Sequence, residues 1–256
     1  MSVDVVRNGA LLEVTINRPK ANAIDAATSR EMSSIFDSFM KDRALRVAIL
    51  TGAGSRFFSA GWDLTAASEG EAFESDYGVG GFGGICELKN RQKPIIAAVN
   101  GMAVGGGFEI AMAADLIVAA DHAEFFLPEA TLGLIADNAT IRLPKIVPPN
   151  IAREMLIAGR RMSATEAQTW GIVNQITSTD DLMNCSRKLA EKICASAPLS
   201  VAAVLELMTE LENVDTDDAM KVLRENKTYR SAIDSNDAIE GSKAYGEKRK
   251  PIWQGE

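Results

Sequence analysis

The sequence is poor in the residues that disulfide frameworks, metal centres and histidine catalysis require. Its 256 residues include three cysteines, Cys86, Cys185 and Cys194, and one histidine, His122. The cysteines have neither an even count nor a Cys-x-x-Cys spacing, which argues against a disulfide framework and a zinc site. We therefore expect a reducing compartment, no metal ion and a reaction that does not depend on several histidines.

Long apolar runs and an excess of positive charge are also missing. The longest apolar stretch, residues 110–120, is interrupted by Asp115, so no membrane span is expected. The N-terminal residues carry Asp4 and Arg7 and show no secretory signal. With 27 Lys and Arg against 35 Asp and Glu, the net charge of −8 disfavours nucleic-acid binding. We expect a cytoplasmic protein that does not bind nucleic acid.

The residues that are present suit a folded globular domain, with 46% hydrophobic and 24% charged. Strand-like stretches end in proline or glycine turns and alternate with stretches of helical periodicity. This alternation is typical of an α/β fold with a parallel sheet and crossover helices. We expect strands over residues 11–16, 46–51, 94–99 and 115–119, and helices over residues 27–40 and 108–114.

The chain changes character near residue 180, after which amphipathic helical spacing dominates. We therefore expect an α/β body over residues 1–180 and a helical C-terminal region over residues 181–256. Residues 65–84, rich in Ser, Glu and Gly, are expected to form a mobile surface loop. The expected C-terminal helices cover residues 180–196, 199–211, 217–233 and 237–250.

Three consecutive glycines, Gly105, Gly106 and Gly107, stand between a predicted strand and a predicted helix. Backbone N–H groups at a helix N-terminus attract negative charge, so this turn can hold an anion or an oxyanion. It lacks the Gly-Lys-Ser/Thr ending of a nucleotide P-loop and the Gly-x-Gly-x-x-Gly pattern. A tight packing turn explains the glycines equally well.

Two glutamates lie in apolar surroundings. Glu109 is inside an apolar helical stretch, and Glu129 follows the apolar residues 125–128. Burial raises the pKa of a carboxyl group toward neutrality, which suits acid–base catalysis. The alternatives are that Glu129 pairs with Arg142 and that Glu109 faces solvent.

Three motifs together resemble the crotonase, or enoyl-CoA hydratase/isomerase, superfamily: Ser-Ala-Gly-Trp-Asp-Leu at residues 59–64 and the segments 100–109 and 127–134. The resemblance covers nearly the whole chain and is greatest to the carnitinyl-CoA dehydratase branch. It implies a ββα spiral body with C-terminal helices for trimerisation. It also implies addition or removal of water across C2=C3 of an acyl-CoA. The more specific expectation is that the substrate is crotonobetainyl-CoA.

The resemblance assigns roles to four residues. The backbone N–H groups of Trp62 and Gly106 would form an oxyanion hole for the thioester carbonyl. Glu109 would take a proton from the water that attacks C3, and Glu129 would supply the proton to C2. No cofactor is implied, because acyl-CoA is itself the substrate.

The resemblance also implies contacts to CoA and substrate. Tyr245 and Lys248 would lie near the CoA phosphates, within one chain or from a neighbouring subunit of a homotrimer or a dimer of trimers. A solvated charged face is the alternative explanation of this basic helix. The full set of implied contacts is Lys20, Ala21, Ala23, Ala60, Gly61, Asp63, Leu64, Gly105, Asp137, Tyr245 and Lys248.

The chain departs from the hydratase pattern at residues 135–142, which contain no glycine where hydratases usually carry a glycine-rich turn. A side chain there can displace the catalytic water, and a shift of ~1 Å can cost about 10²-fold in rate. Asp137 would suit a cationic acyl group, and the Trp62 indole would suit either a quaternary ammonium group or an ordinary acyl chain. Double-bond isomerisation, which needs one carboxylate, and a non-catalytic CoA-binding scaffold remain alternatives.

Overall fold

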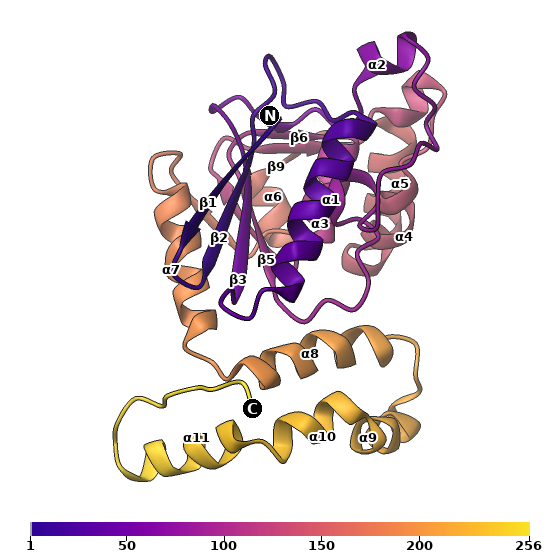
Figure 1. The fold of residues 1–256 in the computed structure, drawn as a ribbon. Helices are drawn as coiled ribbons and strands as arrows, with labels where there is room; N and C mark the ends of the chain where they lie inside the picture. Colours follow the sequence, from indigo (N-terminus) through magenta and orange to yellow (C-terminus); the bar gives the residue numbers. More distant parts are fainter. Residues whose placement is uncertain (1) are drawn as a thin grey trace.

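Two β-sheets form the centre of the protein in its computed structural model, which describes residues 2–256 (Figure 1). The larger sheet contains, in spatial order, β1 (Val3–Asn8), β2 (Leu11–Ile16), β3 (Val47–Gly52), β5 (Ile95–Val99), β7 (Leu116–Ala120) and β10 (Gln175–Thr177). Its pairs are parallel except for β1 and β2. The smaller sheet contains β4 (Phe57–Ser59), β6 (Met102–Val104), β8 (Glu124–Phe126) and β9 (Met162–Ser163), and its last pair is antiparallel.

Helices surround these sheets and continue beyond them to the C-terminus (Figure 1). The body contains α1 (Ala26–Lys41), α2 (Leu64–Ser68), η1 (Phe82–Gly84), α3 (Gly106–Ala113), η2 (Glu129–Leu132), α4 (Asp137–Ile146), α5 (Pro149–Ala158) and α6 (Ala164–Thr169). The helices that follow are α7 (Leu182–Cys194), α8 (Pro198–Glu210), α9 (Thr216–Glu225), α10 (Lys227–Ile233) and α11 (Asn236–Gly246).

Different helices cover the two faces of the larger sheet. Along β3, Leu50 packs in the cluster that contains Phe36 of α1, whereas Ile49 packs in the cluster that contains Leu182 of α7. Successive side chains of a strand point to opposite faces, so α1 and α7 lie on opposite sides of the sheet. A strand that is buried on both faces has a nearly continuous apolar sequence, and β3 has such a sequence.

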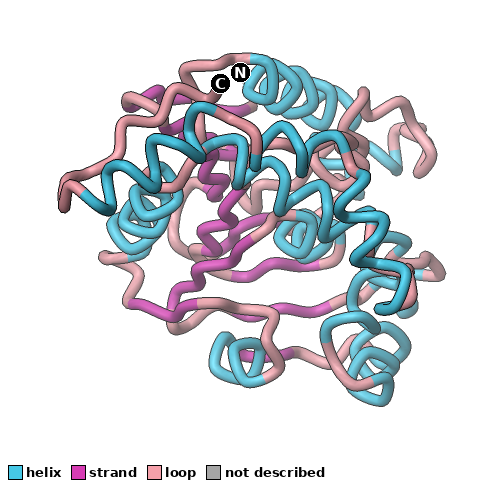
Figure 2. Tube along the Cα trace, turned by 90° about the horizontal axis from the view of Figure 1, so that it is seen from below, coloured by secondary structure: helices cyan, strands magenta, loops and turns pink. Residues whose placement is uncertain are grey.

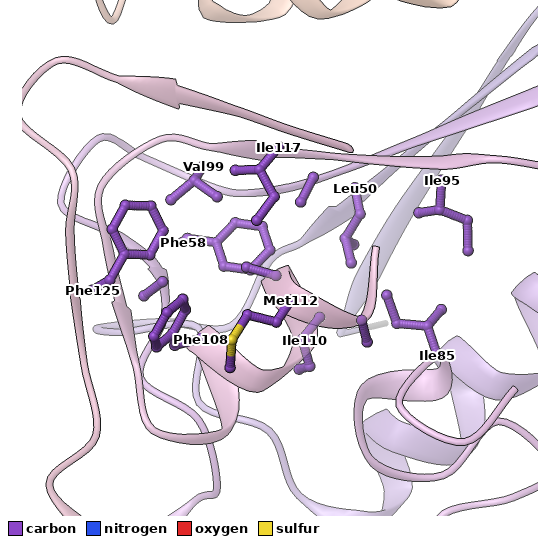
Figure 3. Packing of buried hydrophobic residues seen from close by; sticks show 14 of the residues in the cluster. Leu50, Phe58, Ile85, Ile95, Val99, Phe108, Ile110, Met112, Ile117 and Phe125 are labelled. Carbon is purple, nitrogen blue, oxygen red and sulfur yellow. The ribbon is translucent and has the colours of Figure 1, made fainter. Parts of the chain in front are cut away.

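The main core lies between the larger sheet and α3 (Figure 3). Phe58, Phe108 and Phe125 are fully buried there, and the rings of Phe108 and Phe125 have centroids 5.2 Å apart. Met112 fills the space beside them. Because α3 is held by apolar packing along its whole length, the glycine turn at its N-terminus has a fixed position.

The α/β fold class and the expected strands of the larger sheet are confirmed, with ends shifted by one or two residues. Asp25 caps the start of helix α1, since its side chain accepts a hydrogen bond from the Thr28 N–H at 2.7 Å. The smaller sheet was not predicted. Its strands have two or three residues, which is too short for an alternating pattern to be visible.

The expectation of a surface loop over residues 65–84 is wrong for its second half. Gly80 and Gly83 are buried against α1, where their N–H groups donate to Ser33 Oγ at 2.6 Å and Ser29 Oγ at 3.1 Å. A Cβ on Gly84 would lie 2.5 Å from the backbone of Met32 and Ser33. These glycines therefore allow two backbones to approach closely. Close packing, and not the expected mobility of the segment, accounts for its high glycine content.

Helices α8 to α11 form a separate layer below the sheets in Figure 1, and Figure 2 shows helices of this layer crossing in front of the strands. Ala203 and Leu207 of α8 pack with Ala232 of α10 in a small apolar cluster. The single helix expected over residues 217–233 is two helices, because Asn226 ends α9 and its side chain caps α10 through the Tyr229 N–H. The last helix ends earlier than expected, at Gly246.

Helix α7 packs on the larger sheet through Leu182 and Ala190, although it lies beyond residue 180. The division into residues 1–180 and 181–256 stays a prediction, and this packing favours a boundary nearer the end of α7. Over residues 2–256, no individual helix has the length and apolar character to cross a membrane; α7 and α8, bent by 103°, would qualify only as a pair and only by length and composition.

Candidate active site

A cavity of about 180 Å³ brings together residues from five separate parts of the body. Its lining includes the loop before α2, the segment from Phe73 to Phe82, the turn at the start of α3, η2, and the start of α4. Most of the residues predicted for catalysis or substrate contact meet there. They are Ala60, Trp62, Leu64, Gly105, Gly106, Glu109, Glu129 and Asp137.

The turn that precedes α2 packs directly on the first turn of α3. Gly61 has φ 79°, and a Cβ at this position would lie 2.7 Å from the Gly106 nitrogen and 2.7 Å from the Val104 oxygen. Only glycine combines this backbone conformation with such a close approach. The contact sets Trp62 and Gly106 side by side on the cavity wall.

The backbone N–H groups of these two residues are available to a ligand. Ile24 donates to the Gly61 carbonyl at 2.8 Å and accepts from the Asp63 N–H at 2.9 Å, so the Trp62 N–H points away from that strand. Gly106 is the first residue of α3, where N–H groups have no carbonyl partner within the helix. Two such donors on one wall can stabilise negative charge that develops on a carbonyl oxygen.

Glu109 is buried in α3, with 6% of its surface exposed. Its Oε1 accepts a hydrogen bond from the Ala139 N–H at 2.8 Å. Burial is the main cause that raises the pKa of Glu109 to about 7. The negative charges of Asp137 and Glu129 raise this pKa further, whereas the hydrogen bond from Ala139 lowers it. A carboxyl group with this pKa can both accept and donate a proton near neutral pH.

Glu129 begins η2 and faces the same cavity. Its Oε2 is buried and, among residues 2–256, has no hydrogen-bond partner. Burial raises the pKa of Glu129, and the charge of Asp137 adds to the effect. Gly105 has φ 54°, and a Cβ there would collide with Glu129 Oε1, so this glycine lets the carboxylate come close to the glycine turn.

The glycine-free segment after Glu129 holds Glu109 in place. Residues 137–142 lie in α4, and Ala139, which donates to Glu109, is fully buried. Arg142 donates to the Cys86 carbonyl at 3.1 Å and to Asn138 Oδ1 at 3.3 Å. The alternatives in which Glu109 faces solvent and Arg142 pairs with Glu129 are therefore wrong.

The predicted CoA contacts near the N-terminus run beside the cavity. The Ala60 N–H donates to the Ala21 carbonyl at 2.9 Å, which aligns the segment containing Lys20 and Ala23 with the oxyanion turn. Asp63 does not line the cavity. Its carboxylate caps α2 through the Thr65 N–H and pairs with Arg18 at 3.1 Å, so it holds the turn together.

Tyr245 and Lys248 are not brought to the cavity within one chain. They lie in and just after α11, at the opposite end of the molecule from α2 (Figure 1). The Tyr245 side chain is 88% exposed. His122 is also exposed and lies outside the cavity. Among residues 2–256, no three His, Cys, Asp or Glu side chains are grouped so as to hold a metal ion.

Sequence reasoning missed the aromatic side of the cavity. Phe73, Tyr77 and Phe82 line it, although all three belong to the segment expected to be a mobile loop. Three aromatic residues within an otherwise polar, glycine-rich stretch were the available signal. The remaining lining residues that were not predicted as contacts are Val104, Pro128, Leu132, Leu134 and Ile135.

Residues 6–256 match the family described as enoyl-CoA hydratase/isomerase. Curated proteins named carnitinyl-CoA dehydratase, from Shigella flexneri and Escherichia coli K12, are each 54% identical over 99% of this chain and 98% of their own length.

Solved structures with closely similar folds include enoyl-CoA hydratases. The enzyme from Mycobacterium tuberculosis H37Rv has a TM-score of 0.92 and 40% identity, covering 100% of this chain and 99% of its own. The enzyme from Bacillus anthracis has a TM-score of 0.91 and 30% identity, with both chains covered completely.

Proposed function

This chain belongs to the enoyl-CoA hydratase/isomerase family, and from that premise we propose that it interconverts carnitinyl-CoA and crotonobetainyl-CoA. It is a hydro-lyase of the hydratase/dehydratase type, in common with its curated relatives and structural neighbours. The choice of acyl group is supported by the 54% identity to carnitinyl-CoA dehydratases over almost the full length of both chains.

The observation that carries the proposed mechanism is the meeting of one buried and one partly buried carboxyl group with two backbone donors in one cavity. Glu109 and Glu129 come from different elements and are close enough for the charge of Glu129 to raise the pKa of Glu109. Trp62 and Gly106 line the same cavity through a turn and a helix start that are in contact.

In the hydration direction, the thioester carbonyl accepts hydrogen bonds from the Trp62 and Gly106 N–H groups. Glu109, ionised, removes a proton from water as the water oxygen bonds to C3. The C2=C3 electrons move toward the carbonyl, and the enolate charge falls on the oxygen between the two donors. Glu129, protonated, then delivers its proton to C2.

Dehydration reverses these roles. Glu129, ionised, removes the proton from C2, and Glu109, protonated, donates to the hydroxyl that leaves C3 as water. The proposed reaction draws on no group beyond the protein and its substrate, because the oxyanion hole makes the C2 proton acidic. Loss of one such donor typically reduces the rate by about 10²–10³.

Two observations favour this reaction over the alternatives. Isomerisation needs one carboxylate, whereas two carboxyl groups with raised pKa values line this cavity. A non-catalytic scaffold gives no reason for two carboxyl groups to meet in one cavity, since burial destabilises the charged form of each.

The finer expectations about CoA binding and assembly belong to the same proposal. Because Tyr245 and Lys248 lie far from the cavity of their own chain, we assign them to the CoA site of a neighbouring copy in a homotrimer or a dimer of trimers. The exposed apolar residues of the C-terminal helices, such as Val204 and Met208, support subunit contacts. We place the protein in the cytoplasm, consistent with its free cysteines.

The test is substitution of each glutamate by glutamine, which keeps size and removes the acid–base function. Hydration of crotonobetainyl-CoA, followed as loss of enoyl thioester absorbance, should fall by about 10²–10⁴ in Glu109→Gln and in Glu129→Gln. Glu225→Gln, at an exposed position on α9, is the matched control and should keep wild-type activity. A loss below about tenfold in either active-site variant would exclude the paired-carboxylate mechanism.

A further inference from the structure

One side of the cavity is built from four aromatic side chains. Trp62, Phe73, Tyr77 and Phe82 all line it, and we call these four residues the aromatic box. No Lys, Arg or His lines the cavity, whereas three carboxyl groups do. The cavity therefore combines π faces with negative charge and has, among residues 2–256, no cationic side chain that would attract an anionic acyl group.

The rings of the aromatic box are arranged in two perpendicular pairs. The Trp62 and Phe73 centroids are 5.3 Å apart with an interplanar angle of 81°. The Tyr77 and Phe82 centroids are 5.4 Å apart with an angle of 86°. Perpendicular rings present their faces in different directions, so each pair forms a corner and not a flat wall.

Hydrogen bonds hold the first pair in place. The Trp62 indole Nε1–H donates to Glu71 Oε1 at 3.0 Å. The Glu71 carboxylate also accepts from the Ala26 N–H, at 3.1 Å and 3.0 Å, and so ties the indole to the start of α1. A carboxylate at the indole N–H increases the negative potential of the ring face, which strengthens its attraction for a cation.

The second pair is fixed in the same way. The Tyr77 hydroxyl donates to the Phe73 carbonyl at 2.6 Å, which links the two pairs. Burial and the nearby charges of Glu71 and Asp137 raise the pKa of Tyr77 to about 12, so its hydroxyl stays neutral at physiological pH. Phe82 packs on Gly106, where a Cβ would lie 2.5 Å from the ring. The box therefore begins at the oxyanion turn.

We propose that the aromatic box, with Asp137 beside it, binds a quaternary ammonium group on the acyl chain and selects cationic acyl-CoAs over neutral ones. This inference rests on the proposed function, because it assumes that the acyl chain reacts in this cavity. A trimethylammonium group has no N–H to donate, so ring faces and fixed negative charge are the means of recognising it. In crotonobetainyl-CoA the nitrogen is two bonds beyond C3, which places it near the oxyanion turn where Phe82 lies.

The test compares two substrates of the same shape. One is crotonobetainyl-CoA, and the other is the thioester in which a tert-butyl carbon replaces the trimethylammonium nitrogen. For the wild type we expect kcat/KM to be at least about tenfold higher for the cation, since cation–π contacts contribute ~0.5–2 kcal/mol each. Phe73→Leu and Tyr77→Leu should each reduce that ratio by about 2- to 30-fold.

Conservative and distant substitutions serve as controls. Tyr77→Phe keeps the ring and should preserve most of the preference for the cation. Phe57→Leu replaces a half-buried aromatic residue outside the cavity and should leave the ratio unchanged. Asp137→Asn should lower the ratio through kcat/KM for the cation, because it removes a negative charge from the cavity.

The outcomes separate this inference from the proposed function. Equal kcat/KM for the two substrates in the wild type would overturn the aromatic box and leave the hydro-lyase assignment standing. A cation preference that persists in both leucine variants would also overturn it. If the wild type hydrates neither substrate, the proposed function fails and the inference fails with it.

Discussion

The two sides of the cavity are built differently. The reaction wall, defined by Gly105, Gly106, Glu109 and Glu129, carries two carboxyl groups, on α3 and η2, and the Gly106 N–H at the start of α3. The other side is the aromatic box, held by hydrogen bonds within residues 62–77 and between Glu71 and the Ala26 N–H of α1. Small displacements matter most where protons move, so changes in the reaction wall should cost orders of magnitude and changes in the box much less.

Among changes that leave both glutamates in place, the largest effect is expected for Gly105→Ala. Its Cβ would occupy the place of Glu129 Oε1, so kcat should fall by about 10²-fold or more. Gly54→Ala is the matched control, because Gly54 also has positive φ but a Cβ there meets no atom within 4 Å. Both variants should lose roughly 1 kcal/mol of stability, because alanine is strained at positive φ. Thermal unfolding measures this strain in both variants, and steady-state kinetics reports the displacement of the Glu129 carboxylate, which is expected only in Gly105→Ala. Equal kinetics for the two alanine variants would contradict the predicted collision.

Glu109→Gln should stabilise the protein at alkaline pH while it abolishes activity. The folded state holds the pKa of Glu109 near 7, above its ordinary 4.5, so folding binds a proton and wild-type stability falls as pH rises through that window. The variant should escape this loss, which is on the order of 3 kcal/mol. Urea unfolding at pH 5 and pH 8 measures it; a variant that is destabilised equally at both values would refute the prediction.

The pH–rate profile should show Glu109 directly. Hydration needs it ionised, so kcat/KM for hydration should fall about tenfold per unit as pH drops below about 7. Dehydration starts from the same singly protonated pair of glutamates, and hydration takes up no net proton, so kcat/KM for dehydration should follow the same pH profile. Asp137→Asn should shift this limb to lower pH, because the charge of Asp137 raises the pKa of Glu109. An unshifted limb would show that Asp137 does not act on Glu109.

The smallest effect is expected for Glu71→Gln, which changes the support of the aromatic box and leaves the reaction wall intact. Glutamine is a weaker acceptor for the Trp62 indole and the Ala26 N–H, so KM should rise roughly 3-fold with kcat nearly unchanged. Glu74→Gln, exposed in the same segment, should have no effect on either constant. A fall in kcat as large as that of Gly105→Ala would erase the distinction between the two sides.

The reaction wall could be predicted from sequence because each part of it lies within a short contiguous motif. A glycine run between a strand and a helix exposes N–H groups, and Glu109 follows it within one helical turn. The spatial meeting of Glu109 with Glu129 required the family resemblance, since nothing local links α3 to η2. The hydrogen bond from the Ala139 N–H to the Glu109 carboxylate was not predicted, because nearly every residue has a backbone N–H and the sequence does not show which one donates.

The aromatic box could not be predicted because its placement depends on contacts between distant residues. Ser29 and Ser33 of α1 bind the N–H groups of Gly83 and Gly80, and neither serine differs in sequence from an ordinary helix residue. Glycines that permit close packing have the same composition as glycines in a mobile loop. The break at Asn226 was missed for a similar reason, since helical spacing continues on both sides of it.

A crystal structure with an unreactive acyl-CoA analogue tests the central claim most directly. The account predicts that the thioester oxygen lies about 2.7–3.1 Å from the backbone nitrogens of both Trp62 and Gly106, with Glu109 and Glu129 on either side of C2 and C3. A carbonyl that points away from these nitrogens, or a single glutamate within reach of the reacting carbons, would contradict it.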